Sequence, residues 1–164
     1  MQTAAMTRRF ITGCSSKVEF ADSENVVSHT GLIQHFVASH LTQTVYSQET
    51  FLKLTRLLVP FAERAYSLRD LNSLEEVSRI LMNLPLHAAQ QVGQYYHALA
   101  INRKGRIDEA ETLLKKIADN APTTYRARAI QTLGANTHDK GQLDEAIRFQ
   151  LEALRVASDG TKAH

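Results

Sequence analysis

The heptapeptide frame Lys-Gly-Arg-Ile-Asp-Glu-Ala of residues 104–110 returns as Lys-Gly-Gln-Leu-Asp-Glu-Ala at residues 140–146, which is 36 positions later. A fixed period in the thirties is typical of helical repeats that stack side by side. The recurrence therefore predicts an all-α fold of stacked antiparallel helix pairs. Such arrays mainly present surfaces to other proteins, so the period also argues against an enzyme.

Each residue type in this frame has a physical reason to be there. Gly105 and Gly141 can adopt the positive φ of a tight turn because glycine has no Cβ atom. The Ile or Leu two residues later enters the core, and the Asp-Glu pair lies in the first helical turn, where the helix dipole favours carboxylates. Ala110 and Ala146 keep the helix surface small, so each frame predicts a helix, a tight turn and a second helix.

Composition bounds the class of protein. The chain has 164 residues, of which 43% are hydrophobic, so one domain or one compact array with a real core is expected. A net charge of +2 with interleaved acidic and basic residues argues against a nucleic-acid partner. No window approaches the ~20 apolar residues of a membrane span. The single cysteine, Cys14, excludes an intramolecular disulfide and favours a cytoplasmic location.

An arginine pair near the start of the chain, Arg8-Arg9, superficially resembles an export signal. Such signals need an apolar stretch of roughly 7–15 residues after the basic pair. Only Phe10 and Ile11 stand between the pair and Thr12-Gly13-Cys14, so export by this segment is not expected.

Apolar residues at helical spacing predict a series of helices, and no segment shows the sustained period of two that a strand needs. A first stripe runs from Ile33 to Val45. Further helices are expected at 48–69, 74–84, 87–103, 107–119, 125–138 and 143–157.

Proline and capping residues predict where these helices begin and end. Pro60 lies inside the 48–69 pattern and predicts a break or kink near Leu58–Val59. The expected N-terminal caps are Ser23 or Ser28, Asn72 or Ser73, and Thr123 or Thr124.

The last two helix pairs resemble the tetratricopeptide repeat family, whose helix A carries an aromatic residue, Leu-Gly and Tyr, and whose helix B carries Ala, a bulky residue and a closing Pro. The final repeat offers Ile130, Leu133-Gly134, Thr137, Gly141, Ala146 and Ala153. The middle repeat offers Gln94, His97-Ala98, Ile101, Gly105, Ala110, Leu114 and Pro122. A weaker earlier repeat aligns when Leu74 is matched with Ile107, a step of 33 residues.

The sequence departs from the family pattern at several positions. Neither of the last two repeats has an aromatic residue at its first position, and the other departures are His97 for Leu, Thr137 for Tyr and Gln150 for the bulky helix-B residue. The resemblance implies an α-α superhelix of about seven helices. Its expected parts are an irregular arm at 1–24, a helical segment at 25–57 and a repeat array at 58–160, divided near 58–90, 91–126 and 127–160.

Small residues in the two clear repeats are expected where helices approach closely or turn tightly. They are Ala98, Gly105, Ala110, Gly134, Gly141 and Ala146.

Residue types that support catalysis or metal binding are present without a supporting pattern. His35 and His40 are five residues apart, which places them on different sides of a helix, and the other histidines have no ligand set. Glu75-Glu76, Asp108-Glu109 and Asp144-Glu145 are expected in first helical turns, where they stabilise the helix. The sequence therefore predicts no metal, no cofactor and no catalytic residue, with Cys14 an ordinary free thiol.

The resemblance implies a concave groove that is lined by the first helix of each pair and binds a protein or peptide. The matching faces would present Tyr66, Arg69, Tyr95, Leu99, Asn102, Arg128, Gln131 and His138. Aromatic and arginine side chains suit protein recognition. The equally weighted alternative is a solvated helix face with Tyr95 or Leu99 partly in the core.

The apolar side of the helix at 143–157 is expected to be incompletely covered. It would then either form a homodimer contact or belong to a longer array. The second functional hypothesis is accordingly an oligomerisation or regulatory fragment of a larger multidomain protein.

Overall fold

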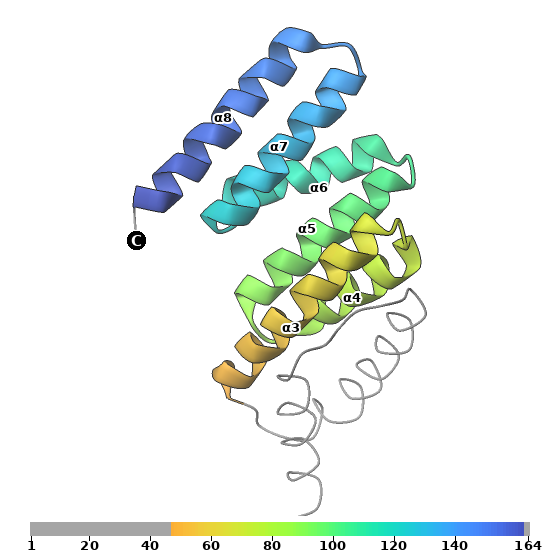
Figure 1. Cartoon of the computed structure of the whole chain (residues 1–164), viewed down its shortest axis with the longest axis vertical. Coiled ribbons are helices and arrows are strands. Elements are labelled where there is room, and N and C mark those ends of the chain that lie inside the picture. The colour runs from red at the N-terminus through yellow and green to blue at the C-terminus, as the bar shows by residue number, and fades with distance from the viewer. Residues whose placement is uncertain (1–46, 163–164) are drawn as a thin grey trace, which may run out of the picture.

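The computed structural model describes residues 47–162, and within this range the chain forms six helices and no strand. They are α3 (Gln48–Ser67), α4 (Leu71–Asn83), α5 (His87–Arg103), α6 (Ile107–Asn120), α7 (Thr123–Asp139) and α8 (Leu143–Lys162) (Figure 1). The predicted all-α class is confirmed. The arm at 1–24, the stripe from Ile33 to Val45, and residues Cys14, His35 and His40 lie outside the described residues.

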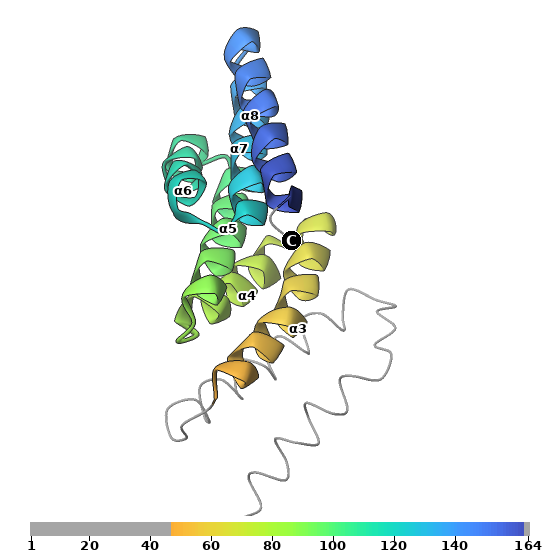
Figure 2. The same ribbon diagram turned by 90° about the vertical axis from the view of Figure 1, so that its left-hand side faces the viewer.

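Consecutive helices pack against each other along the chain. In addition, α3 contacts α5 and α5 contacts α7, so the first helices of the three pairs are neighbours across the array. Figure 2 shows α7 and α8 side by side at one end of the described part and α3 and α4 at the other. The face shared by α3, α5 and α7 is where the candidate site lies.

The core runs through most of the array as one cluster of buried residues, which includes Leu58, Leu74, Leu81, Tyr96 and Leu114. A second, smaller cluster joins α7 and α8 and contains Ile130, Ala153 and Val156. Each helix pair buries its apolar face partly against the next pair, as expected for stacked helical units.

The turns within the three helix pairs recur with a period of 36 residues. The second helices begin at Leu71, Ile107 and Leu143. Before them, Arg69, Gly105 and Gly141 have φ values of 57°, 82° and 78°. The residue after each of these three positions donates its backbone N–H to a carbonyl five residues earlier, at 2.9, 3.2 and 3.1 Å. This is the hydrogen bond of a Schellman motif, which needs a left-handed residue after the helix.

Two predictions are therefore wrong at the first turn. Leu71, and not Leu74, is the residue equivalent to Ile107, because the step between the pairs is 36 and not 33 residues. Arg69 is not on a helix face, because it occupies the left-handed turn position that glycine occupies in the other two pairs.

The reciprocal exchange of these turn residues is expected to change stability in opposite directions. A side chain in the left-handed region costs about 1 kcal/mol through its Cβ. Gly105→Arg should therefore lower the free energy of unfolding by about 1 kcal/mol, and Arg69→Gly should raise it by a somewhat smaller amount because glycine also frees the unfolded chain. Urea unfolding followed by circular dichroism measures both changes, and effects of the same sign would contradict the assignment.

A cap by Asp70 explains why α4 begins at Leu71 and not at the predicted residue 74. The carboxylate of Asp70 accepts hydrogen bonds from the backbone N–H of Ser73 at 3.1 Å and from its hydroxyl at 2.6 Å. Asp70 is thus the N-cap, and the helix starts three residues earlier than predicted from Asn72 or Ser73.

The ends of the last two helices also differ from the predictions. Helix α7 begins at Thr123 with Pro122 as its N-cap residue, so the cap predicted at Thr123 or Thr124 is wrong. Helix α8 continues beyond the expected end at residue 157, through Gly160, to Lys162.

Of the break or kink predicted near Leu58–Val59, the break is wrong, because α3 is continuous through Pro60. Pro60 is exposed, so the carbonyl that lacks its N–H donor is on the solvent side. On the core side, Leu58 and Ala62 are fully buried and hold the helix in place.

Small residues lie at the close helix contacts, as predicted. Ala98, Ala110 and Ala146 are buried. A Cβ atom added to Gly134 would lie 3.0 Å from the Cβ of Phe149 on α8. A closer approach was not predicted: at Gly93, an added Cβ would lie 2.7 Å from two backbone atoms of α4.

Candidate functional site

A groove of about 610 Å³ lies across the face shared by α3, α5 and α7. We call it the α5–α7 groove. Five of the eight predicted residues line it, namely Tyr66, Tyr95, Leu99, Asn102 and Gln131. The lining residues that sequence reasoning missed are Arg103, Ile107, Thr132, Ala135, Asn136, Asp139 and Gln150.

The two predicted apolar members of this groove belong mainly to the core. Tyr95 is 7% exposed and Leu99 is 4% exposed, so each contributes only an edge to the groove. The accessible part of the lining comes instead from polar side chains and from the exposed residues Gln131 and Ala135 on α7.

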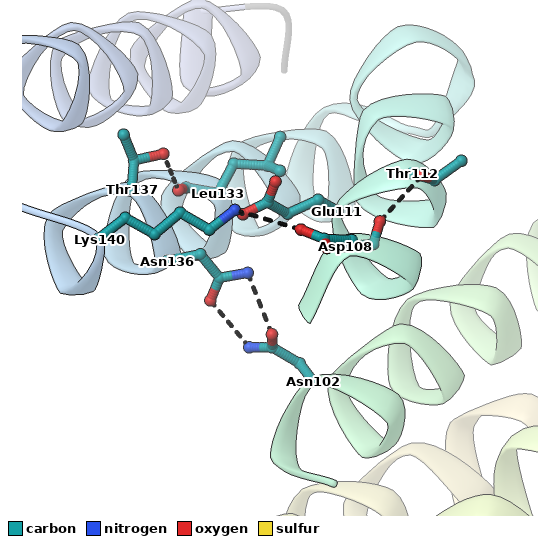
Figure 3. A network of polar contacts seen from close by, with 8 residues as sticks. All are labelled: Asn102, Asp108, Glu111, Thr112, Leu133, Asn136, Thr137 and Lys140. Carbon is teal, nitrogen blue, oxygen red and sulfur yellow. Dashed lines mark hydrogen bonds and ion pairs between the residues drawn. The ribbon is translucent and has the colours of Figure 1, made fainter. Parts of the chain in front are cut away.

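Two asparagine side chains join α5 to α7 in the wall of the groove. The amide of Asn102 donates to the Oδ1 atom of Asn136 at 2.9 Å, and the amide of Asn136 donates back to Asn102 at 3.0 Å (Figure 3). Each amide keeps one further N–H and one acceptor lone pair. This reciprocal pair fixes the orientation of both side chains. Asn136 is only 6% exposed, so the half-buried Asn102 is the member whose remaining hydrogen-bonding capacity a ligand can reach.

The α3 side of the groove is formed by Tyr66 and Arg103. The guanidinium of Arg103 on α5 donates to the hydroxyl of Tyr66 at 3.0 Å, and its Cζ atom lies 4.8 Å from the centre of the tyrosine ring. The contact holds an aromatic and a basic side chain together at one edge of the site.

Tyrosines from α5 and α7 form a cluster that includes the groove residue Tyr95. The ring of Tyr95 meets those of Tyr96 and Tyr125 edge to face, with centroid distances of 5.4 and 5.5 Å. Burial raises the pKa of all three phenols above the ordinary value of 10.

Glu63 connects this tyrosine cluster to α3. Its Oε1 atom accepts from the Tyr96 hydroxyl at 3.4 Å and from Arg128 at 3.2 Å. Arg128 therefore links α7 to α3 through this contact with Glu63, and it does not line the α5–α7 groove.

Repeated ion pairs hold the ends of the first helices beside the second helix of the preceding pair. The Nζ atom of Lys104 lies 2.7 Å from Oε1 of Glu75. The same contact recurs 36 residues later, where Nζ of Lys140 lies 2.7 Å from Oε1 of Glu111 (Figure 3). Glu75 thus has a lysine partner and does not lie in the first turn of α4, contrary to the prediction. Asp108, Glu109, Asp144 and Glu145 do lie in first turns, as predicted.

A second groove of about 600 Å³ adjoins the first and runs between α7 and α8. We call it the α7–α8 groove. It contains the predicted residue His138, which is therefore separated from the five that line the α5–α7 groove. Its lining is mainly apolar, with Leu143, Ile147 and Leu151 contributed by α8.

Residues 47–162 contain no group of three or more histidine, cysteine or carboxylate side chains placed to hold a metal ion. None of the helices in this range is both long and apolar enough to cross a membrane.

The α5–α7 groove can bind a ligand through hydrogen bonds and through contacts that match its shape. Amide and hydroxyl side chains can bond to the main chain of an extended peptide, while the edges of Tyr95 and Leu99 can contact its side chains. Comparisons with protein-family models, with curated proteins and with solved structures found no match to this chain.

Proposed function

We propose that this protein is a non-enzymatic interaction module that binds a peptide segment of another protein in the α5–α7 groove. The observation that carries the proposal is the reciprocal Asn102–Asn136 hydrogen-bond pair in the groove wall. Amides that are fixed in this way pay little ordering entropy when they bond to a peptide backbone.

The sequence resemblance to tetratricopeptide repeats supports the same role and implies a superhelical arrangement of the pairs. That resemblance rests on the frame of residues 104–110, which returns 36 residues later, and on the small residues of the last two helix pairs. The proposal includes a cytoplasmic location, which the single cysteine of the chain supports.

Filling the groove tests this proposal directly. Peptides that bind the full chain would first be selected from a random peptide library. Gln131→Trp places an indole in the groove from an exposed position of α7, so we expect the selected peptides to bind at least about tenfold more weakly. Fluorescence anisotropy of labelled peptides measures the dissociation constants.

The matched control is Lys115→Trp, which adds the same side chain at an exposed position of α6 that does not line the groove. Binding should be unchanged in this variant. Equal affinities of the two variants, or failure to select any peptide on the wild-type chain, would refute the groove as the binding site.

A further inference from the structure

Helix α8 carries an unpaired apolar stripe. Leu143, Ile147, Leu151 and Leu154 are between 56% and 68% exposed, and they are four of the seven large hydrophobic residues that are exposed in the described part of the chain. The neighbouring face of the same helix buries Ala146, Ala153 and Val156. Single exposed leucines are ordinary, but a continuous stripe of this kind marks a contact surface.

The stripe is not simply the surface that one repeat presents to the next. The equivalent positions of α6, 36 residues earlier, are Ile107, Glu111, Lys115 and Ala118. Glu111 pairs with Lys140 of the following helix pair, and Lys115 is exposed. The apolar character at all four positions is therefore particular to α8, and it fits a partner other than a further helix pair of the same kind.

We propose that α8 is a homodimer interface, in which it packs antiparallel against α8 of a second copy about a two-fold axis near residue 149. A two-fold contact requires a surface that is complementary to itself. The stripe meets this requirement, because the axis places Leu143 opposite Leu154 of the second copy and Ile147 opposite Leu151.

Charges along the edge of the stripe fit the same axis. At 100° per residue, Asp144 and Arg155 lie on one edge of the stripe, and both are exposed. Equivalent edges face each other in an antiparallel helix pair, so Asp144 of each copy lies opposite Arg155 of the other. Within one chain, Arg155 already donates to the carboxylate of Glu152 at 2.9 and 3.0 Å, so in the dimer it would be shared between Glu152 and Asp144 of the second copy. A parallel arrangement would not bring Asp144 and Arg155 together.

The α7–α8 groove enlarges the available surface. Leu143, Ile147 and Leu151 belong both to the stripe and to this groove of about 600 Å³. Leucine side chains of the second copy can enter it, which extends the contact from α8 to α7. A stable dimer buries about 800 Å² on each partner, so the contact would need both the stripe and the adjoining groove.

The first experiment measures the mass of the full chain by sedimentation equilibrium from about 1 to about 100 μM, a range suited to micromolar dimers. We expect twice the monomer mass at the upper end. Leu151→Asp should raise the dissociation constant at least about tenfold, because it buries a carboxylate in the apolar contact. Glu145→Lys, on the opposite side of α8, is the charged control and should leave the dimer intact.

A charge exchange tests the antiparallel register without removing any apolar side chain. Asp144→Arg and Arg155→Asp should each weaken the homodimer, because each places like charges opposite one another. Mixing the two variants should restore a heterodimer, because one of the two ion pairs then forms with its charges exchanged and the other is the original Asp144–Arg155 pair. A monomeric wild-type chain, a dimer insensitive to Leu151→Asp, or no recovery on mixing would overturn the proposal.

Discussion

Gly93→Ala is expected to lower the free energy of unfolding by about 2 kcal/mol. The new Cβ atom would lie 2.7 Å from the backbone nitrogen of Met82 and 2.7 Å from the carbonyl oxygen of Ser78. Both atoms belong to the backbone of α4, so the clash can be relieved only by separating α4 from α5. Overpacking of this kind costs about 1–3 kcal/mol or somewhat more, which outweighs the gain in helix propensity of about 1 kcal/mol.

Gly134→Ala is the matched comparison, because it introduces the same methyl group at another helix contact. The nearest atom there is Nε2 of Gln150 at 2.9 Å, the end of a flexible side chain, and the next is the Cβ of Phe149 at 3.0 Å. We expect a change within about 1 kcal/mol, since propensity and crowding nearly cancel. Urea unfolding measures both variants, and equal effects would show that the α4–α5 contact can relax.

The difference between these two glycines illustrates what the sequence could predict. The sequence predicts a close helix contact at Gly134, because this residue stands seven positions before Gly141 in the repeated frame. The frame also gave the correct roles of Gly105 and Gly141, whose positive φ values the structure confirms. Gly93 stands in no such frame, and its need for space arises only from the position of α4, which local sequence does not encode.

Local competition explains the errors at the first helix pair. Asp70, Asn72 and Ser73 are all good caps, and sequence alone does not decide among them. A cap at Asn72 or Ser73, with Leu74 matched to Ile107, shifts the repeat by three residues and obscures the equivalence of Arg69 to the turn glycines. A strict 36-residue step would have found that equivalence, although arginine is a poor residue for a left-handed turn.

The candidate site was only partly predictable, because its walls are joined by contacts distant in sequence. Tyr66, Asn102 and Gln131 could be placed by helical spacing. In contrast, the partner of Asn102 lies 34 residues away on α7, and the partner of Tyr66 lies 37 residues away on α5. The sequence predicts Arg128 in the groove, but its side chain donates a hydrogen bond to Glu63, 65 residues earlier. These pairings depend on how the helices cross.

The largest pH effect is expected in alkaline solution, where Tyr96 alone should cost the protein about 1.4 kcal/mol of stability per pH unit above pH 10. Tyr95 and Tyr96 are 7% and 2% exposed, and burial raises the pKa of each phenol. In the unfolded chain both phenols ionise near pH 10, whereas folding moves their ionisation to higher pH. The unfolded state then binds fewer protons, so rising pH favours unfolding, and Tyr95 adds to the effect of Tyr96 in the same direction.

Tyr96→Phe identifies the origin of this slope. The variant loses one ionisable group and the weak hydrogen bond to Glu63, but it keeps the ring and its edge-to-face contacts. The lost bond lowers stability by a similar amount at every pH, whereas the lost ionisation should reduce the alkaline slope by about 1.4 kcal/mol per pH unit. Urea unfolding between about pH 8 and pH 11, with phenolate absorbance followed in parallel, measures both. An unchanged slope in Tyr96→Phe would mean that Tyr96 ionises without unfolding, and hence that the tyrosine cluster admits water.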